Sequence, residues 1–348
     1  MLGVLAGRFT ATVAAFAAVA AVSAAPAAAA GTASTTQGTT TSTTATTPSS
    51  TTTTTPVFAT LALSVPDAFL VNHHLVTVPG RTVHVHGVVK PYVAGQWVLV
   101  QDSVNGKVFK TDHLRIQPAP GGHNGEFTET LSSPKAGHVT VEVGHTRNTA
   151  LGGMLARRSL DALNESVSFG SSGLFVALIQ QRLAALHFYI PQTGVYDTGT
   201  GLALDAYHRL MHWGTSQTLD SRVISFLLDG YGQFPVRFPG NGRHAEGNLS
   251  LQLLALVDGS HVVAIYPISS GKPSTPTILG NFRVYSRVPG YLPDGMYFSN
   301  FFISGYAIHG YDPAPDYPAS HGCMRLPIVD AISVFNWLAI GDWVDTYY

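Results

Sequence analysis

The sequence is poor in cysteine, in charge and in long apolar runs. Its 348 residues include one cysteine, Cys323, which excludes a disulfide framework and a multi-cysteine zinc site. Charged residues make up 11%, roughly half the usual share, and 19 basic against 20 acidic side chains give a net charge of −1. Such a chain has no basic surface for wrapping nucleic acid. After the N-terminal region no segment approaches about 18 unbroken apolar residues, so we do not expect a multi-pass membrane protein.

The N-terminal region has the composition of an export signal. Residues 1–30 carry one charged side chain, Arg8, then an apolar run over residues 13–22 and a run of alanines that offers cleavage sites. We predict a signal peptide, with an uncleaved membrane anchor as the alternative. Residues 31–56 are rich in threonine and serine, have nothing to bury, and are predicted to be a disordered linker that is open to glycosylation. The protein is therefore expected outside the cytoplasm, secreted or associated with the cell envelope.

Residues 57–150 alternate apolar and polar side chains with the period of a β-strand. Residues 83–86 and 139–143 are examples, and turn-forming pairs such as Asn105-Gly106 separate the runs. Many short strands of this kind predict an all-β sandwich, and the pattern resembles bacterial immunoglobulin-like spacer domains. Residues 151–168 are predicted to be a connector with some helical tendency.

Residues 169–230 change to a helical period. Apolar side chains recur at helical spacing over residues 175–186 and 203–211, and Asp220 or Ser221 is predicted to cap a third helix. Residues 179–183 and 194–196 carry a similarity to the peptidoglycan-binding domain of bacterial wall enzymes. The alternative is a helical packing module without a ligand.

Residues 235–348 return to β character. Strands are predicted at residues 249–253, 262–266, 282–285 and 343–345, and one helix at residues 330–338. The fold class that we predict is multidomain and mainly β. It has an N-terminal β-sandwich, a small three-helix bundle and a C-terminal, mostly β domain.

The chemistry is concentrated in residues 307–326. This stretch holds a thiol, two imidazoles, a serine, an arginine and two glycines. An imidazole can take the thiol proton of Cys323 and leave a thiolate. Gly322 permits close approach to the backbone, and N–H groups beside Cys323 can donate to a developing oxyanion. No histidine follows Cys323, so its base lies upstream, unlike the order in papain-like peptidases. These groups are what acyl transfer through a thioester requires.

The run from Ser320 to Arg325, with His309-Gly310 upstream, resembles the active-site motif of L,D-transpeptidases. Residues 266–271, 275–277 and 280–282 extend the resemblance over about 110 residues. The resemblance implies a C-terminal catalytic domain at residues 235–348, with Cys323 as nucleophile and His309 as base, held by a main-chain carbonyl near Gly310.

The resemblance also implies roles for the residues around this pair. The amides of Gly322 and Cys323 hold the oxyanion, and Ser320 and His321 shape the pocket; whether His321 is structural or catalytic stays open. Arg325 holds the motif loop or a substrate carboxylate. Gly310 and Tyr311 are expected to contact substrate.

The implied function is an exported peptidoglycan L,D-transpeptidase that cross-links stem peptides in cell-wall biogenesis and maintains cell shape. Carbapenem-type inhibitors are expected to react with Cys323. An L,D-carboxypeptidase with the same site and a non-catalytic wall-binding protein remain alternatives. No metal-ligand spacing such as H-E-x-x-H occurs, and we predict no metal and no cofactor. The sequence does not indicate an oligomeric state.

Overall fold

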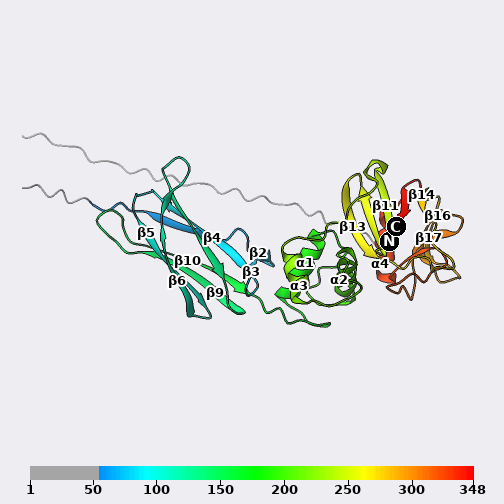
Figure 1. Ribbon diagram of the computed structural model, residues 1–348, viewed down its shortest axis with the longest axis horizontal. Coiled ribbons are helices and arrows are strands. Elements are labelled where there is room, and N and C mark those ends of the chain that lie inside the picture. Colours follow the sequence, from blue (N-terminus) through cyan, green and yellow to red (C-terminus); the bar gives the residue numbers. More distant parts are fainter. Residues whose placement is uncertain (1–54) are drawn as a thin grey trace, which may run out of the picture. The chain divides into compact units, whose positions relative to one another are not determined.

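The computed structural model describes residues 55–348 (Figure 1). The predicted signal peptide and all but the last two residues of the predicted linker lie outside the described residues. In the described part, the chain is mainly β and forms several sheets with four α-helices, which confirms the predicted fold class. No helix among these residues is both long and apolar enough to span a membrane.

The N-terminal part is a sandwich of two sheets around one apolar core. The first sheet has the order β1-β4-β8-β7, with β1 at Thr60–Ser64, β4 at Thr82–Lys90, β8 at Gly125–Ser132 and β7 at Gln117–Pro118. The second has the order β2-β3-β10-β9-β5-β6, with β2 at Phe69–Val71, β3 at His74–Thr77, β10 at Met154–Ala162, β9 at Gly137–His145, β5 at Trp97–Val104 and β6 at Lys107–Arg115. Alternate residues such as Val83 and Val85 are buried between the sheets, as the period predicts.

The range 151–168 differs from the connector that we predict there. Strand β10 occupies half of it and pairs along its whole length with β9, from Met154 opposite His145 to Ala162 opposite Gly137. Its sequence, MLARRSLDA, has the charges of an exposed helix, and its apolar and polar residues alternate only weakly. The neighbouring strand, and not the local pattern, makes this segment β.

Three helices follow, drawn in green in Figure 1: α1 at Leu174–Ala185, α2 at Thr198–Leu210 and α3 at Ser221–Leu228. Asp220 caps α3, as predicted, by accepting a hydrogen bond from the Val223 amide at 2.8 Å. Asp197 caps α2 in the same way through Thr200.

The helices do not have a core of their own. Their buried side chains belong to one apolar cluster that also contains Leu253, Ala255 and Ile265 of the C-terminal domain and Val76 of β3. Burial of a continuous apolar interface stabilises contact between modules. The bundle and the C-terminal domain are therefore packed together through a shared core.

The C-terminal domain contains two sheets and one helix. One sheet has the order β13-β12-β11-β19-β14, with β13 at His261–Pro267, β12 at Leu253–Asp258, β11 at Arg243–Asn248, β19 at Trp343–Tyr347 and β14 at Gly280–Arg283. The other has the order β15-β16-β17-β18, with β15 at Ser286–Tyr291, β16 at Tyr297–Ile303, β17 at Tyr306–Gly310 and β18 at Met324–Leu326. Helix α4, at Ile328–Trp337, follows β18.

The strand predicted at residues 249–253 is instead the turn between β11 and β12. Gln252 has a φ of 53°, in the left-handed region, so the chain reverses there. The alternation of leucine with polar residues is the pattern of a strand, but Leu249 and Gln252 are buried as turn residues. The side chain of Gln252 forms hydrogen bonds to Ser270, beside the motif that carries Cys323.

Candidate active site

Parallel pairing of β17 with β18 brings the two halves of the motif together. His309 lies opposite Arg325 in this register, and Cys323 comes directly before β18. Ser304 and Gly305, both with positive φ, make the tight turn from β16 into β17. The strand that carries one predicted catalytic residue is therefore the immediate neighbour of the segment that carries the other.

Six of the eight predicted site residues line one cavity of about 420 Å³. The lining residues are Asp294, Met296, Ser304, Gly305, Tyr306, His309, Tyr311, Ser320, His321, Cys323 and Arg325. The two predicted residues that do not line it are Gly310 and Gly322.

His309 is held as a neutral imidazole. It is 2% exposed, and its Nδ1 lies 2.9 Å from the Gly310 carbonyl, which can only accept, so Nδ1 carries the proton and Nε2 is left as the base. Burial, with help from the Arg325 charge, lowers the pKa of His309 to about 4 against the smaller upward effects of the Gly310 hydrogen bond and Asp294. The expected main-chain carbonyl is thus that of Gly310 itself.

Cys323 is a partly buried free thiol. Its Sγ accepts a hydrogen bond from the Ala307 amide at 3.4 Å and lies 3.8 Å from the Gly305 carbonyl, to which the thiol donates. Burial raises the pKa of Cys323, although the Ala307 hydrogen bond and the Arg325 charge act the other way. No hydrogen bond joins Sγ to a nitrogen of His309 in the part of the chain that the structure describes.

The resting pair is therefore a thiol and a neutral imidazole. This corrects the sequence expectation of a thiolate formed by the neighbouring ring, and the cause is burial, which disfavours both charged forms. Hydrogen bonds between catalytic groups are often long in a free enzyme and shorten only when substrate is bound.

Ser320 shapes the turn that presents the sulfur. Its hydroxyl donates to the Cys323 carbonyl at 2.6 Å and accepts from the Gly322 amide at 3.0 Å. The Gly322 amide thus already has an acceptor in the free protein, and its predicted role in the oxyanion hole would require it to leave Ser320. Of the two predicted donors, the Cys323 amide remains.

The two glycines are required by side-chain contacts and not by substrate. A Cβ on Gly322, at a φ of 120°, would lie 1.7 Å from Cε1 of Tyr306. A Cβ on Gly310 would lie 2.7 Å from the Cβ of Ala331 in α4. Gly310 is buried and contributes its carbonyl to His309, while its contact with substrate stays a prediction.

Arg325 and His321 lie at the cavity with different partners. The Arg325 guanidinium lies 4.0 Å from the centre of the Tyr311 ring and forms no ion pair among the described residues. Exposed His321 accepts a hydrogen bond at Nε2 from Lys272 Nζ at 3.2 Å. A guanidinium without a carboxylate partner is suited to a substrate carboxylate, whereas His321 already has a cation at its free nitrogen.

The segment after β13 holds the motif in place. Ser269 and Arg325 exchange two backbone hydrogen bonds of 2.9 Å, and the Ser270 carbonyl accepts the amides of Ala319 and Ser320, both at 2.9 Å. The sequence motif is therefore fixed by backbone pairing to residues about fifty positions upstream.

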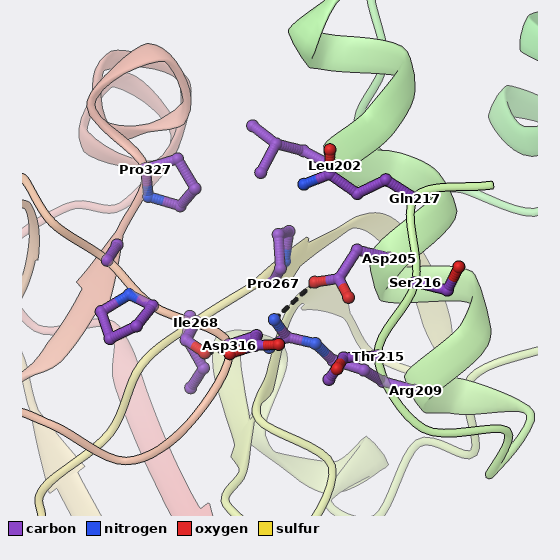
Figure 2. A pocket seen from close by; sticks show the side chains of 12 residues that line it. Leu202, Asp205, Arg209, Thr215, Ser216, Gln217, Pro267, Ile268, Asp316 and Pro327 are labelled. Carbon is purple, nitrogen blue, oxygen red and sulfur yellow. Dashed lines mark hydrogen bonds and ion pairs between the residues drawn. The ribbon is translucent and has the colours of Figure 1, made fainter. Parts of the chain in front are cut away.

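Arg209 of α2 supports that segment from the helical bundle. Its Nη1 donates to the carbonyls of Gln252 and Ile268 at 2.9 and 3.0 Å, and Nη2 pairs with Asp205 at 2.5 Å (Figure 2). The Gln252 side chain in turn bonds the Ser270 hydroxyl and amide, at 2.7 and 2.8 Å. Arg209 is 6% exposed, so these contacts are shielded from water.

A second cavity, of about 300 Å³, lies beside Arg209 (Figure 2). It is bounded by α2, by the loop after α2 and by Ala314, Pro315 and Asp316 of the loop between the two motif histidines. It shares no lining residue with the cavity at Cys323. The thiol chemistry therefore belongs to the other cavity.

Sequence reasoning missed five lining residues of the active-site cavity. These are Asp294, Met296, Ser304, Gly305 and Tyr306. The Ser304-Gly305 pair is a hairpin signal that could have been recognised. Asp294 and Met296 come from the turn between β15 and β16, and no local pattern connects that turn with Cys323. Among the described residues, no group of three or more His, Cys, Asp or Glu side chains has a metal-binding arrangement.

Comparison with known proteins gives a family match for one segment. Residues 242–345 match the YkuD family, the L,D-transpeptidase catalytic domain. No curated protein matches the chain.

Three solved structures are among those that are similar. An L,D-transpeptidase from Xylanimonas cellulosilytica is 29% identical, with 53% of this chain and 98% of that one covered and a TM-score of 0.48. The catalytic domain of an Enterococcus faecium L,D-transpeptidase is 25% identical, with 31% and 98% covered and a TM-score of 0.28. The same domain acylated by ertapenem is 25% identical, with 30% and 97% covered and a TM-score of 0.27.

Proposed function

From the premise that residues 242–345 form an L,D-transpeptidase catalytic domain of the YkuD family, we propose that the protein is an exported peptidoglycan L,D-transpeptidase that works through a Cys323 thioester. The observation that carries this proposal is the shared cavity of Cys323 and His309, in which the Gly310 carbonyl fixes the Nδ1 proton and leaves Nε2 as a base. A positioned nucleophile and base are the minimum for covalent acyl transfer.

The first half of the reaction forms the acyl-enzyme. Nε2 of His309 takes the thiol proton as Sγ of Cys323 attacks the carbonyl carbon before the terminal D-alanine of a tetrapeptide stem. The Cys323 amide donates to the oxyanion that forms. The carbon–nitrogen bond then breaks, and D-alanine leaves with the proton from His309. Arg325, at the same cavity without an ionic partner, binds the carboxylate of the departing D-alanine.

The second half resolves the thioester. A side-chain amine of another stem attacks the acyl carbon, and the thiolate leaves and recovers its proton. The product is a cross-link between third residues. Attack by water instead gives the tripeptide of an L,D-carboxypeptidase, so the products distinguish the two activities.

The other regions are assigned supporting roles in this proposal. The signal-like N-terminus exports the protein to the envelope, where its substrate lies. The helical bundle binds peptidoglycan, and the N-terminal sandwich is a spacer. Intact mass of the protein from the producing cells tests export, because cleavage near Ala30 removes the predicted signal peptide.

Replacement of the sulfur tests the mechanism. Cys323→Ala should abolish D-alanine release and dimer formation from a purified stem tetrapeptide, measured by mass spectrometry, while binding to sacculi is retained. Activity equal to that of the wild type in this variant would contradict the thioester mechanism.

A carbapenem gives an independent measure of the same thiol. The strained acyl ring should be opened by Cys323, and intact-protein mass spectrometry should show one adduct that Cys323→Ala lacks. Folded wild-type protein without a mass shift would contradict the assignment of the nucleophile.

A further inference from the structure

The active-site cavity contains one positive and one negative side chain that are not paired with each other. These are Arg325 and Asp294, and no ion pair of the described residues includes either one. Both charges act on both reacting groups: Arg325 lowers and Asp294 raises the pKa of His309 and of Cys323. Each charge is therefore within electrostatic range of the place where the acyl group is transferred.

Asp294 lies in a turn that is fixed against the cavity wall. The turn joins β15 and β16, and the Asp294 Oδ1 accepts a hydrogen bond from the Met296 amide at 3.3 Å. Gly295, at a φ of 87°, lies so close to the Tyr311 ring that a Cβ there would be 3.3 Å from Cε2. The same ring carries Arg325 on it at 4.0 Å. Tyr311 thus contacts both the turn of Asp294 and the guanidinium.

A two-step acyl transfer places opposite charges in this cavity in turn. In the first step the donor brings a carboxylate, one residue beyond the bond that breaks. In the second step the acceptor brings an amine that is an ammonium ion in neutral water. Water, the competing nucleophile, brings no charge. A carboxylate at the cavity therefore favours the amine and gives water no advantage.

We propose that Asp294 is a positioning residue for the acceptor: its carboxylate binds the ammonium group of the incoming stem and so directs the thioester to transfer and away from hydrolysis. This inference rests on the proposed function. The inference extends that function because it assigns a different charged residue to each half of the reaction. Arg325 binds the donor carboxylate, and Asp294 binds the acceptor ammonium.

The proton balance of the second step requires no additional reactant. The acceptor ammonium has three protons. One stays in the new amide, one returns to the sulfur by way of His309 Nε2, and one is released to solvent. The carbon–nitrogen bond forms as the carbon–sulfur bond breaks. Asp294 only holds the amine while His309 exchanges protons.

Asp294→Asn tests the inference, with D-alanine, tripeptide and dimer measured together by mass spectrometry at varied acceptor concentration. We expect the acceptor KM to rise about tenfold and the ratio of dimer to tripeptide to fall by about the same factor, since a hydrogen bond to a charged group becomes a neutral one. Release of D-alanine without acceptor should change by a smaller factor than the acceptor KM, because that step does not use the ammonium group.

Three controls separate acceptor binding from a general effect. Asp312→Asn removes an exposed acid of the neighbouring loop that lines neither cavity, and should leave the ratio unchanged. Asp294→Glu should recover most of the acceptor affinity. Hydroxylamine, a nucleophile that is uncharged at neutral pH, should lose less in the Asp294→Asn variant than the ammonium-bearing acceptor does.

Two results would overturn the inference while the proposed function stands. One is normal D-alanine release with an unchanged acceptor KM and product ratio in Asp294→Asn. The other is a parallel fall in D-alanine release, dimer formation and hydroxylamine attack, which would mean that Asp294 acts through His309 or the fold. If the wild type releases no D-alanine, the proposed function fails and the inference fails with it.

Discussion

Two buried histidines of the catalytic domain have pKa values shifted in opposite directions, although both are removed from water. His309 is 2% exposed and His244 is 0% exposed. The pKa of His309 is lowered to about 4, whereas that of His244 is raised above its ordinary value of 6.5. Burial acts downward on both, so the difference comes from the partners.

The partner of His244 is a buried carboxylate. Its Nε2 donates to Oε1 of Glu246 at 3.1 Å, and its Nδ1 donates to the Gly242 carbonyl at 2.7 Å, so both nitrogens carry protons. Burial alone would raise the pKa of Glu246, but hydrogen bonds from His244, the amides of Arg237 and Phe238, and Tyr347 lower it. His309 has a carbonyl and a nearby guanidinium instead. A carbonyl orients a ring without charging it, which suits a base, whereas a carboxylate favours the protonated form of the ring and raises its pKa.

Removal of His309 should give the largest effect and should concern activity. His309→Gln is expected to lower D-alanine release by about a thousandfold or more, the usual contribution of a general base, with little change in the melting temperature. The matched control is His321→Gln at the same cavity, which should lose less than about tenfold because Lys272 already occupies its Nε2. Similar losses in the two variants would mean that the base is misassigned.

At the buried pair of His244 and Glu246 we expect an effect on stability and not on activity. Glu246→Gln leaves the His244 imidazolium buried without a counter-ion, and should cost about 3–5 kcal/mol of unfolding free energy. Urea unfolding monitored by fluorescence measures it. Glu142→Gln, which breaks an exposed pair with Arg157, should cost less than about 1 kcal/mol. Equal costs would show that burial of the pair does not matter.

The pH dependence of the unfolding free energy should also distinguish His309 from His244, with a smaller effect than the two substitutions above. Between pH 6.5 and about 4 the unfolded chain binds a proton at residue 309 and the folded chain does not, so stability is lost as the pH falls. His244 acts the other way: its contribution is present below pH 6.5 and is lost as the pH rises through its raised folded pKa.

Between neutral pH and pH 4 the His309→Gln variant should therefore lose less unfolding free energy than the wild type, by up to about 3 kcal/mol. The midpoint of urea unfolding at each pH measures this difference. In the active enzyme, the acid limb of kcat/KM should lie near pH 4. An acid limb near the ordinary value of 6.5 would mean that the ring is solvated in the free enzyme.

Local patterns were enough to predict the three helices of the bundle and the chemical groups of the site. Helix periods and the Asp220 cap were visible because a helix is a local structure. The absence of a histidine after Cys323 placed the base upstream, and the resemblance to L,D-transpeptidases assigned it to His309. The amides, carbonyls and glycines were not predictable in the same way. Gly310 is a glycine because of Ala331, and Gly322 because of Tyr306, and neither contact leaves a signal in the neighbouring sequence.

The same limit explains the segments that were assigned wrongly. The strand β10 is specified by pairing with β9 and β3, and the turn at Gln252 by the side-chain bonds that it makes to Ser270. Asp294 joins the active-site cavity through the hairpin of β15 and β16, whose register only tertiary structure defines. Backbone geometry and long-range contacts therefore determined what the residue types alone left open.

The hydrogen bond from Arg209 to the Ile268 carbonyl limits how the helical bundle can be removed or replaced. An excised fragment that starts at residue 242 lacks α2, so the carbonyls of Gln252 and Ile268 lose the Arg209 guanidinium as a donor. The apolar face that β12 and β13 share with the bundle is then exposed. The helical bundle is thus structurally coupled to the catalytic domain and is not an independent attachment to it. A module grafted in its place would have to cover the same apolar face and supply a donor to the Ile268 carbonyl.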